Sequence, residues 1–222
     1  MKKVSATSLR FTQSDHKLKE EDRIVQTIET TNKSDLLFFT NKSVVYKMKT
    51  YEVNDSKVTS MGEFMPGILG LDNDEKILYT VVTTDYKGIM LFSFLNGKIA
   101  KVGLENYATK TNRKKLIGAY SDKADVCDIK WFGEEEEIVC YADNNKVLVV
   151  STDKIPIKST KSTQGVQVMK LTKKGAKMVR VVKSAESGIE NLKYYTTKNI
   201  PAVGSFLKKD DTIDRQISLF ED

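Results

Sequence analysis

The chain has 222 residues, 40% of them hydrophobic, and its 36 Lys and Arg residues against 30 Asp and Glu leave a formal net charge of +6. A chain of this length can bury a core without disulfides or a structural metal. Its two cysteines, Cys127 and Cys140, lie in separate apolar runs without metal-ligand spacing, so they are expected to be buried and reduced. The sequence has neither a signal-peptide core nor an apolar stretch of membrane-helix length. These features predict a soluble cytoplasmic protein with no membrane contact, and the basic excess makes nucleic acid a candidate partner.

The elements predicted along the chain are almost all short β-strands. Runs rich in Val, Ile, Tyr, Phe and Thr alternate with turns of Asn, Gly, Asp and Lys, which is typical of strands. In chain order these runs cover residues 23–31, 35–40, 43–49, 76–84, 88–94, 98–104, 126–132, 137–142, 146–152, 165–171, 178–184 and 192–198. Helical periodicity is scarce, so the sequence predicts an all-β fold.

Internal repetition organises these strands. Three segments, which begin at Leu36, Met90 and Ile138, align without gaps at offsets of 54 and 48 residues. The pairs Lys42-Ser43, Asn96-Gly97 and Asn144-Asn145 fall in register at their centres. Because Asn and Gly tolerate a positive φ, each repeat is predicted to contain a β-hairpin closed by a two-residue primed turn.

A polar, cation-bearing loop and a further strand follow each hairpin. A period near 50 residues with about four strands per repeat predicts blades that pack side by side. The predicted domain covers residues 1–190, with a partial first blade at 1–34 and blades at about 35–87, 88–135 and 136–190. Residues 191–222 form a C-terminal segment whose early part is a candidate for a last strand, followed by an acidic tail.

Several of these stretches resemble a known family. "LLFFTNKSVVYKMKTYEV" followed by "GEFMPGILGLDNDEKILYTVVTT" resembles the C-terminal domain of the A subunit of bacterial type IIA topoisomerases, DNA gyrase and topoisomerase IV. "TKTNRKKLIGAYSDK" and "KSTKSTQGVQVMKL" resemble later blades of that domain, so the likeness runs from residue 7 to about 185. The resemblance implies a β-pinwheel, a propeller-like disc of about four four-stranded blades that exchange strands with their neighbours. Such a short disc can be open or incomplete.

The resemblance also implies a function. The family domain binds double-stranded DNA without sequence specificity and bends or wraps it, presenting the transported segment for supercoiling, relaxation or decatenation. Its partners are the ATPase B subunit together with the remainder of the A subunit, on the nucleoid in the cytoplasm. The catalytic tyrosine and the metal site belong to other parts of the enzyme, so the domain is expected to be non-catalytic and to need no cofactor, although the parent enzyme is expected to use ATP and Mg.

Two alternatives remain open. The region that corresponds to the glycine- and arginine-rich box of gyrase has no such run, which favours a topoisomerase IV-like subunit or a divergent gyrase relative. A propeller-like protein-interaction module with no DNA role is the second reading of the same architecture.

The candidate DNA-binding residues are cations that recur at blade spacing, because each phosphate that a cation neutralises releases counterions and adds to affinity. They are Arg10, Lys17, Lys57, Lys110, Arg113, Lys114, Lys115, Lys158 and Lys161. Ser and Thr lie between many of them and offer hydroxyl contacts to phosphate oxygens. The simpler interpretation is that these lysines only keep a β-protein soluble.

A last motif lies near the C-terminus. "QISLF", formed by Gln216, Ile217, Ser218, Leu219 and Phe220, resembles the pentapeptide with which bacterial replication and repair proteins dock on the DNA sliding clamp. Such a peptide places its Gln amide against polar groups and its last two side chains in an apolar pocket. The alternatives are that these residues pack on the disc or match by chance.

Overall fold

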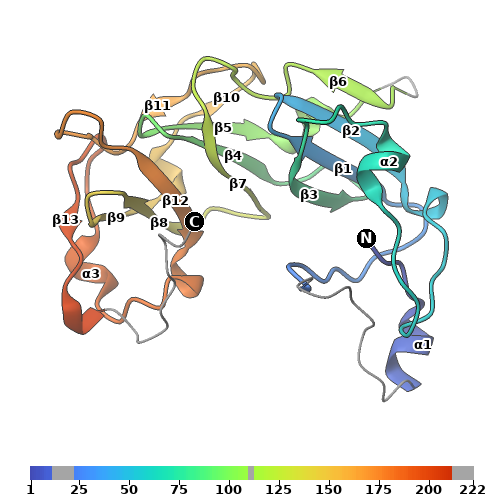
Figure 1. Cartoon of the computed structure of the whole chain (residues 1–222). Coiled ribbons are helices and arrows are strands. Elements are labelled where there is room, and N and C mark those ends of the chain that lie inside the picture. The colour runs from blue at the N-terminus through green and yellow to red at the C-terminus, as the bar shows by residue number, and fades with distance from the viewer. Residues whose placement is uncertain (12–22, 110–112, 212–222) are drawn as a thin grey trace. The chain divides into compact units, whose positions relative to one another are not determined.

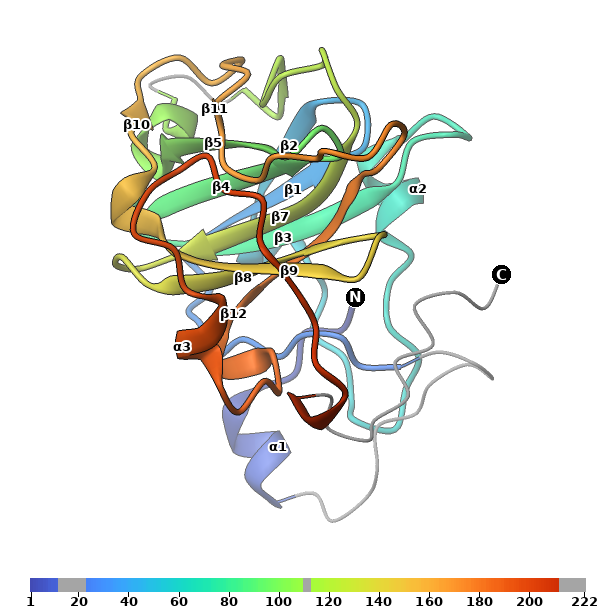
Figure 2. The ribbon, with the colours of Figure 1, turned by 90° about the vertical axis from the view of Figure 1, so that its left-hand side faces the viewer.

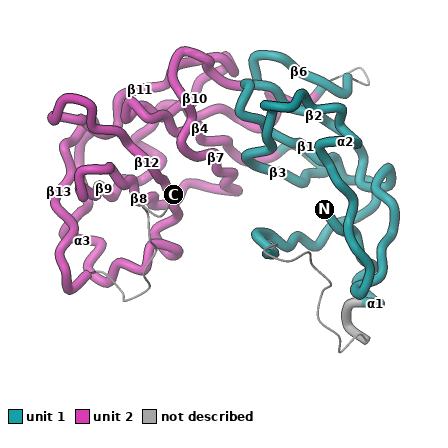
Figure 3. Tube along the Cα trace, viewed as in Figure 1, with its two compact units in different colours: residues 1–86, 109–119 teal, residues 87–108, 120–222 magenta. Residues whose placement is uncertain are grey.

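The computed structural model describes residues 1–11, 23–109 and 113–211 (Figure 1). It divides into two compact units, unit 1 with Met1–Tyr86 and Thr109–Ala119, and unit 2 with Lys87–Ala108 and Tyr120–Asp222 (Figure 3). The described residues form three β-sheets and a few short helices, which confirms the all-β prediction. The α-helices are α1 (Ala6–Phe11), α2 (Met65–Leu69) and α3 (Leu192–Tyr195), and the 3-10 turns are η1 (Thr50–Glu52), η2 (Leu104–Tyr107), η3 (Thr152–Lys154), η4 (Ser184–Glu186) and η5 (Lys209–Asp211). Among the described residues, no helix is both long and apolar enough to span a membrane.

Unit 1 contains one four-stranded antiparallel sheet in the order β3-β1-β2-β6. Its strands are β1 (Asp35–Thr40), β2 (Val44–Lys49), β3 (Ile77–Thr83) and β6 (Lys115–Ile117). One face of the sheet packs apolar side chains such as Phe38 and Met48 together with Met65 of α2 and forms the core of this unit.

Unit 2 contains two sheets (Figure 2). The first has the order β10-β5-β4-β7, and β11 also pairs with β5. Its strands are β4 (Ile89–Phe94), β5 (Lys98–Gly103), β7 (Val126–Phe132), β10 (Ile157–Lys158) and β11 (Val166–Gln167), and β10 is the parallel member. The second sheet, β12-β8-β9-β13, is antiparallel and consists of β8 (Glu137–Ala142), β9 (Lys146–Ser151), β12 (Met178–Lys183) and β13 (Ser205–Phe206).

The three sheets follow one connection rule. The first strand of each hairpin pairs with a later strand of the same repeat, β1 with β3, β4 with β7 and β8 with β12. The edge strand next to the second hairpin strand comes from farther along the chain: β6 follows the second hairpin but pairs with β2 of the first, and β10 and β11 follow the third hairpin but pair with β5 of the second. We call β6, β10 with β11, and β13 the exchanged strands. Two of the three therefore come from the next repeat.

The hairpin turns differ from the prediction. In each turn only the second residue of the predicted pair has a positive φ, with values of 57° at Ser43, 80° at Gly97 and 61° at Asn145. The N–H of Gly97 donates to the oxygen of Phe94 at 2.9 Å, and that of Asn145 to the oxygen of Ala142 at 3.1 Å. The predicted two-residue primed turn is therefore wrong, because three residues lie between the ends of the paired strands and form a turn that ends in one left-handed residue.

Two predicted strands are replaced by other structure. Within residues 23–34 the structure has no strand, and Ile24, Val25 and Ile28 are exposed. The strands that directly precede the second and third hairpins, β3 and β7, each pair with the hairpin before them. The described residues before 23 contain α1 and no such hairpin, so a strand at 23–31 has no partner there. The strand predicted at residues 192–198 is also wrong, because α3 places Leu192 and Tyr195, three residues apart, on one apolar cluster.

Candidate nucleic-acid interface

The predicted cations gather on and beside the exchanged strands. In unit 1, Arg113 and Lys114 lead into β6 and Lys115 opens it, and all three side chains are exposed. In unit 2, Lys158 lies exposed on β10, and the half-buried Lys161 follows in the segment between β10 and β11. Strand exchange therefore carries the cationic loop of one repeat to the edge of the sheet built by the preceding repeat.

Lys57, the other predicted residue with a described side chain, does not join this arrangement. Lys57 is exposed in unit 1, where its carbonyl closes a turn by accepting the N–H of Ser60 at 3.1 Å. Arg10 lies in α1, and the orientation of its side chain is outside the described structure. Lys17, Lys110 and the QISLF peptide at 216–220 lie outside the described residues.

Neighbouring lysines at β6 are held in different ways. Lys114 forms an ion pair with the Glu52 carboxylate, with 3.0 Å between Nζ and Oε2. The backbone N–H of Lys49 donates to the other oxygen of Glu52 at 2.8 Å. This hydrogen bond, followed by the ammonium of Lys114, lowers the pKa of Glu52, so the carboxylate stays charged and offsets part of the positive charge at Lys114.

Lys115 is held by an aromatic ring. Its ammonium lies 5.0 Å from the ring centroid of Tyr46, and the hydrogen bond to that side chain raises the pKa of Lys115. The Tyr46 hydroxyl donates to Oε2 of the buried Glu75 at 2.9 Å, and the Thr40 hydroxyl donates to the other carboxylate oxygen at 2.5 Å. These hydrogen bonds hold the Tyr46 ring in place. A ring positions an ammonium without neutralising its charge. Lys115 therefore presents a fixed cation to solvent.

Lys161 repeats this arrangement in unit 2. Its ammonium lies 5.7 Å from the centroid of Tyr107, a fully buried ring that ends η2 directly after β5. Burial raises the pKa of the Tyr107 hydroxyl, so the ring stays neutral. The segment that carries Lys161 can approach β5 closely because Gly165 has a φ of 71° and no side chain. A Cβ at this position would lie 2.1 Å from the backbone oxygen of Ile99. The cation is thus anchored on the 3-10 turn that follows the second hairpin.

Two further edge lysines were not predicted from the sequence. Lys98 opens β5 and donates to Oε1 of Gln164 at 3.3 Å, and Lys146 opens β9 with its ammonium 5.2 Å from the ring of Phe206. These two lysines occupy the same position of the aligned repeats, 48 residues apart. That recurrence was the available signal, but it lies inside the hairpins rather than in the cationic loops that follow them.

Other lysines of the hairpins are committed to the fold. Lys49 forms an ion pair with Asp35 at 2.9 Å, while Lys47 and Lys101 are buried. Their ammonium groups serve internal contacts and are not candidates for DNA.

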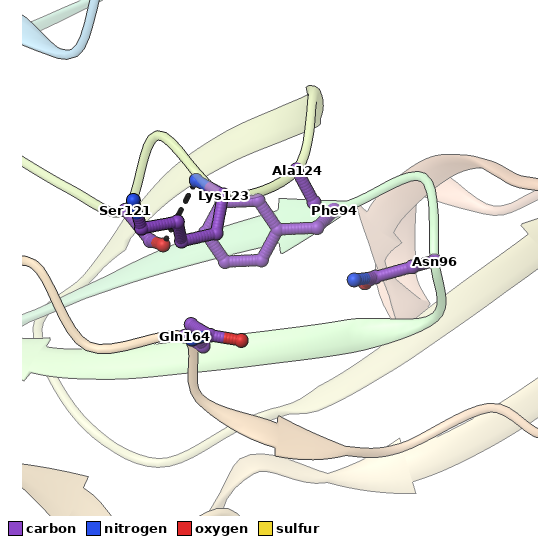
Figure 4. A pocket seen from close by; sticks show the side chains of 6 residues that line it. All are labelled: Phe94, Asn96, Ser121, Lys123, Ala124 and Gln164. Carbon is purple, nitrogen blue, oxygen red and sulfur yellow. Dashed lines mark hydrogen bonds between the residues drawn. The ribbon is translucent and has the colours of Figure 1, made fainter.

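The described residues also contain a small surface hollow in unit 2, lined by Phe94, Asn96, Ser121, Lys123, Ala124 and Gln164 (Figure 4). The N–H of Lys123 donates to Oγ of Ser121 at 3.3 Å. The lining residues include no paired nucleophile and base, so the hollow offers hydrogen-bonding groups beside Lys98 rather than an active site.

The cysteines and acidic residues do not form a chemical centre in the described part of the chain. Both thiols are free, Cys140 is buried and Cys127 is half-buried, where burial raises the pKa of Cys127 to about 12. Such thiols are unreactive at neutral pH, and the burial predicted for both cysteines is complete at Cys140 and partial at Cys127. Over the described ranges no group of three or more His, Cys, Asp and Glu side chains is arranged to hold a metal ion.

The chain matches known proteins in sequence and in structure. The family model described as "DNA gyrase C-terminal domain, beta-propeller" matches residues 34–84 and 136–183, the stretches that contain β1 to β3 and β8 to β12. The DNA gyrase A protein of Borrelia hermsii is 24% identical over 156 residues, which cover 69% of this chain and 19% of that protein. The DNA gyrase A protein of Borreliella burgdorferi is 24% identical over 172 residues, covering 77% and 21%. The chain thus spans about a fifth of the length of these relatives.

Among solved structures, the crystal structure of the C-terminal domain of DNA topoisomerase IV superposes with a TM-score of 0.71 at 26% identity, covering 82% of this chain and 57% of that one. The E. coli ParC C-terminal domain gives a TM-score of 0.65 at 12% identity over 90% of this chain and 87% of that one, a likeness of fold. The predicted resemblance and the β-pinwheel class are confirmed by these matches.

Proposed function

We propose that the chain, whose first and third repeats match the DNA gyrase C-terminal β-propeller family, is a member of that family and binds double-stranded DNA without sequence specificity. In this proposal it bends or wraps the DNA and presents the transported segment to a type IIA topoisomerase. It does so as an accessory domain that needs no cofactor, on the nucleoid in the cytoplasm. Catalysis, ATP and Mg belong in this proposal to the ATPase B subunit together with the remainder of the A subunit.

The observation that carries the proposal is the placement of cations on the exchanged strands. Lys115 and Lys161 come from different repeats, and each has its ammonium over a tyrosine, Tyr46 in the first hairpin and Tyr107 in the 3-10 turn directly after the second. Duplex DNA offers phosphates at regular spacing, so fixed cations at the spacing of blades gain affinity with each phosphate contacted and read no bases.

The first test is a charge reversal at β6. In the triple variant Arg113→Glu, Lys114→Glu, Lys115→Glu, the affinity for a random-sequence duplex should fall at least tenfold, and the slope of log affinity against log salt should flatten by about 0.9 for each phosphate that is no longer neutralised. The matched control reverses the exposed Lys173, Lys174 and Lys177, which changes net charge equally at the turn before β12. Equal losses in both variants, or no duplex binding by the wild type at low salt, would overturn the proposal.

Bending and wrapping are separated by a topology assay. The protein is bound to relaxed closed circular DNA, which is then treated with a nicking-closing enzyme. A change in linking number that grows with protein concentration indicates wrapping and gives its sign, whereas ligase-mediated circularisation of short fragments without such a change indicates bending.

The C-terminal peptide adds a finer proposal. QISLF is proposed to dock on the DNA sliding clamp, on the strength of its sequence. Purified clamp should bind the full chain and lose at least tenfold affinity for the variant Leu219→Ala, Phe220→Ala, with Ser218→Ala as a control that keeps the apolar pair. Equal and negligible binding by all three chains contradicts this proposal.

A further inference from the structure

A row of alternating cations and exposed aromatic rings lies at the exchanged strand of the third sheet. Lys146 and Phe206 are paired across β9 and β13, with the ammonium 5.2 Å from the ring centroid. Two residues farther on, the Lys208 ammonium lies 3.6 Å from the ring of Tyr194 in α3, which lies close to β13 in Figure 1. Phe206 is 65% exposed and Tyr194 is 49% exposed. We call these four residues the aromatic row.

The row is fixed in place by the residues behind it. Leu207 packs against the buried cluster beneath β9, and its N–H donates to the oxygen of Asn145 at 2.9 Å. Because Leu207 faces inward, its neighbours Phe206 and Lys208, both exposed, face outward. The N–H of Lys208 donates to the Tyr195 hydroxyl at 3.0 Å, which in turn donates to the buried Asp211 at 2.6 Å.

The corresponding positions of the other sheets lack this chemistry. In the first sheet the pair is Val44 and Ile117, and in the second it is Lys98 and Gln167. Ile117 is 81% exposed but lies opposite a valine across the strands. At this register, an ammonium beside an exposed ring therefore occurs only in the third of the described sheets, whereas the ring under Lys115, Tyr46, is buried.

The surroundings of the row are basic. Residues 191–211 contain four exposed lysines and two acidic residues, of which Asp211 is buried and bonded to Tyr195. The lysines are Lys193, Lys198, Lys208 and Lys209. An anionic ligand with flat apolar groups complements both the charge and the rings.

We propose that the aromatic row binds nucleic acid with unpaired bases, as a site distinct in chemistry from the duplex-binding edges. A base that stacks on the exposed face of Phe206 or Tyr194 leaves its flanking phosphates within reach of Lys146 and Lys208. Base stacking on an aromatic side chain is favourable and tolerant of sequence, but a base can reach the ring only where it is not stacked in a duplex. The site therefore selects single-stranded or locally opened DNA.

The test measures binding of fluorescein-labelled oligo-dT of about 12 nucleotides, within the range covered by single-strand sites, by anisotropy at low salt beside a mixed-sequence duplex. Phe206→Ala should weaken oligo-dT binding roughly tenfold or more, and Phe206→Leu should weaken it similarly, because it keeps apolar bulk but removes the ring. Phe206→Trp should retain the affinity. Ile117→Ala, at the same register of the first sheet, is the matched control and should change it by less than about twofold.

The outcomes separate this inference from duplex binding. No oligo-dT binding by the wild type, or equal binding by Phe206→Ala and Ile117→Ala, overturns the aromatic row as a site. An equal loss of duplex and oligo-dT affinity in Phe206→Ala overturns its selectivity for unpaired bases. Ring-dependent oligo-dT binding in a protein that does not bind duplex would sustain the row while the proposed function fails.

Discussion

The first and second repeats bury a lysine at the same aligned position and satisfy it in different ways. Lys47 in unit 1 is 9% exposed, donates to the Thr109 hydroxyl at 3.0 Å and lies 5.0 Å from the ring of Tyr86. Lys101 in unit 2 is 4% exposed, donates to the oxygen of Thr152 at 3.0 Å and forms an ion pair with Glu135. One ammonium is therefore held by a ring and a hydroxyl, and the other by a carboxylate and a carbonyl.

The difference shows which part of the repeat is constrained. Tyr86 and Glu135 each follow the end of the third strand of their sheet by three residues, so the repeat keeps the position of the partner while its chemistry varies. In the third repeat the lysine is replaced by the fully buried Val149, so a charge at this position is not required. The aligned turn position varies in the same way, with Ser43 in the first repeat and Gly97 in the second, both at positive φ.

Exchanging the turn residues should give the largest effect. A Cβ at Gly97 would lie 2.2 Å from the oxygen of Met169 and 2.8 Å from Nε2 of Gln167, so Gly97→Ser forces the backbone of that segment to move. We expect a loss of about 2 to 3 kcal/mol in the free energy of unfolding, measured by urea denaturation. The reciprocal substitution Ser43→Gly introduces a residue that readily adopts a positive φ, so the free energy of unfolding should change by less than about 1 kcal/mol. Similar losses at both positions would show that turn conformation, and not the approach of Met169, limits the residue at Gly97.

Removing the carboxylate partner should give the next largest effect. Glu135→Ala leaves the Lys101 ammonium buried with the Thr152 carbonyl as its acceptor, and it also removes the acceptor of the Thr152 hydroxyl at 2.5 Å. Breaking a buried pair costs about 3 to 5 kcal/mol, and the 45% exposure of the Glu135 side chain reduces this to about 2 kcal/mol. Urea denaturation measures the loss, with Glu134→Ala in the same acidic run as a control expected within about 0.5 kcal/mol.

A second substitution sharpens this result. Adding Lys101→Met to Glu135→Ala removes both charges and should recover most of the loss, because an apolar residue already fills the position at Val149. If the double variant is as unstable as Glu135→Ala, the cost lies in packing around Glu135 rather than in an uncompensated ammonium.

The ring partner should matter less. Tyr86→Leu removes the ring near Lys47 together with the hydrogen bond from the Tyr86 hydroxyl to Asp35 at 3.1 Å, while Thr109 still accepts from the ammonium. We expect a loss of about 1 to 2 kcal/mol by urea denaturation. Tyr86→Phe keeps the ring and should lose less than half of that amount. A Tyr86→Phe variant as unstable as Tyr86→Leu would assign the effect to the Asp35 hydrogen bond.

These comparisons also show how far the sequence could predict the structure. The alternation of apolar strands and the alignment of the hairpins predicted the all-β fold, and the cationic loops predicted Arg113 to Lys115 as an exposed cluster. The repeats could not show that β6 joins the preceding sheet, because strand exchange is a long-range pairing that local patterns do not encode. They equally could not show that Lys114 faces Glu52 while Lys115 faces Tyr46, since both partners lie more than 60 residues away.

The smallest expected effect is a pH-dependent loss of stability, which should occur where a carboxylate holds the lysine and not where an aromatic ring holds it. The folded state lowers the pKa of Glu52 below the ordinary 4.5, chiefly through the N–H of Lys49 and then through Lys114. The stability contributed by the Glu52 carboxylate is therefore present above about pH 4.5 and is lost as pH falls through the lowered folded pKa. Since the pair is exposed, Glu52→Gln should cost about 0.5 kcal/mol at pH 7 and almost nothing at pH 3. The difference between Tyr86→Leu and Tyr86→Phe rests on a ring and should stay the same at both values. A Glu52→Gln penalty that persists in acid would mean that side-chain shape, and not its charge, holds the segment before β6.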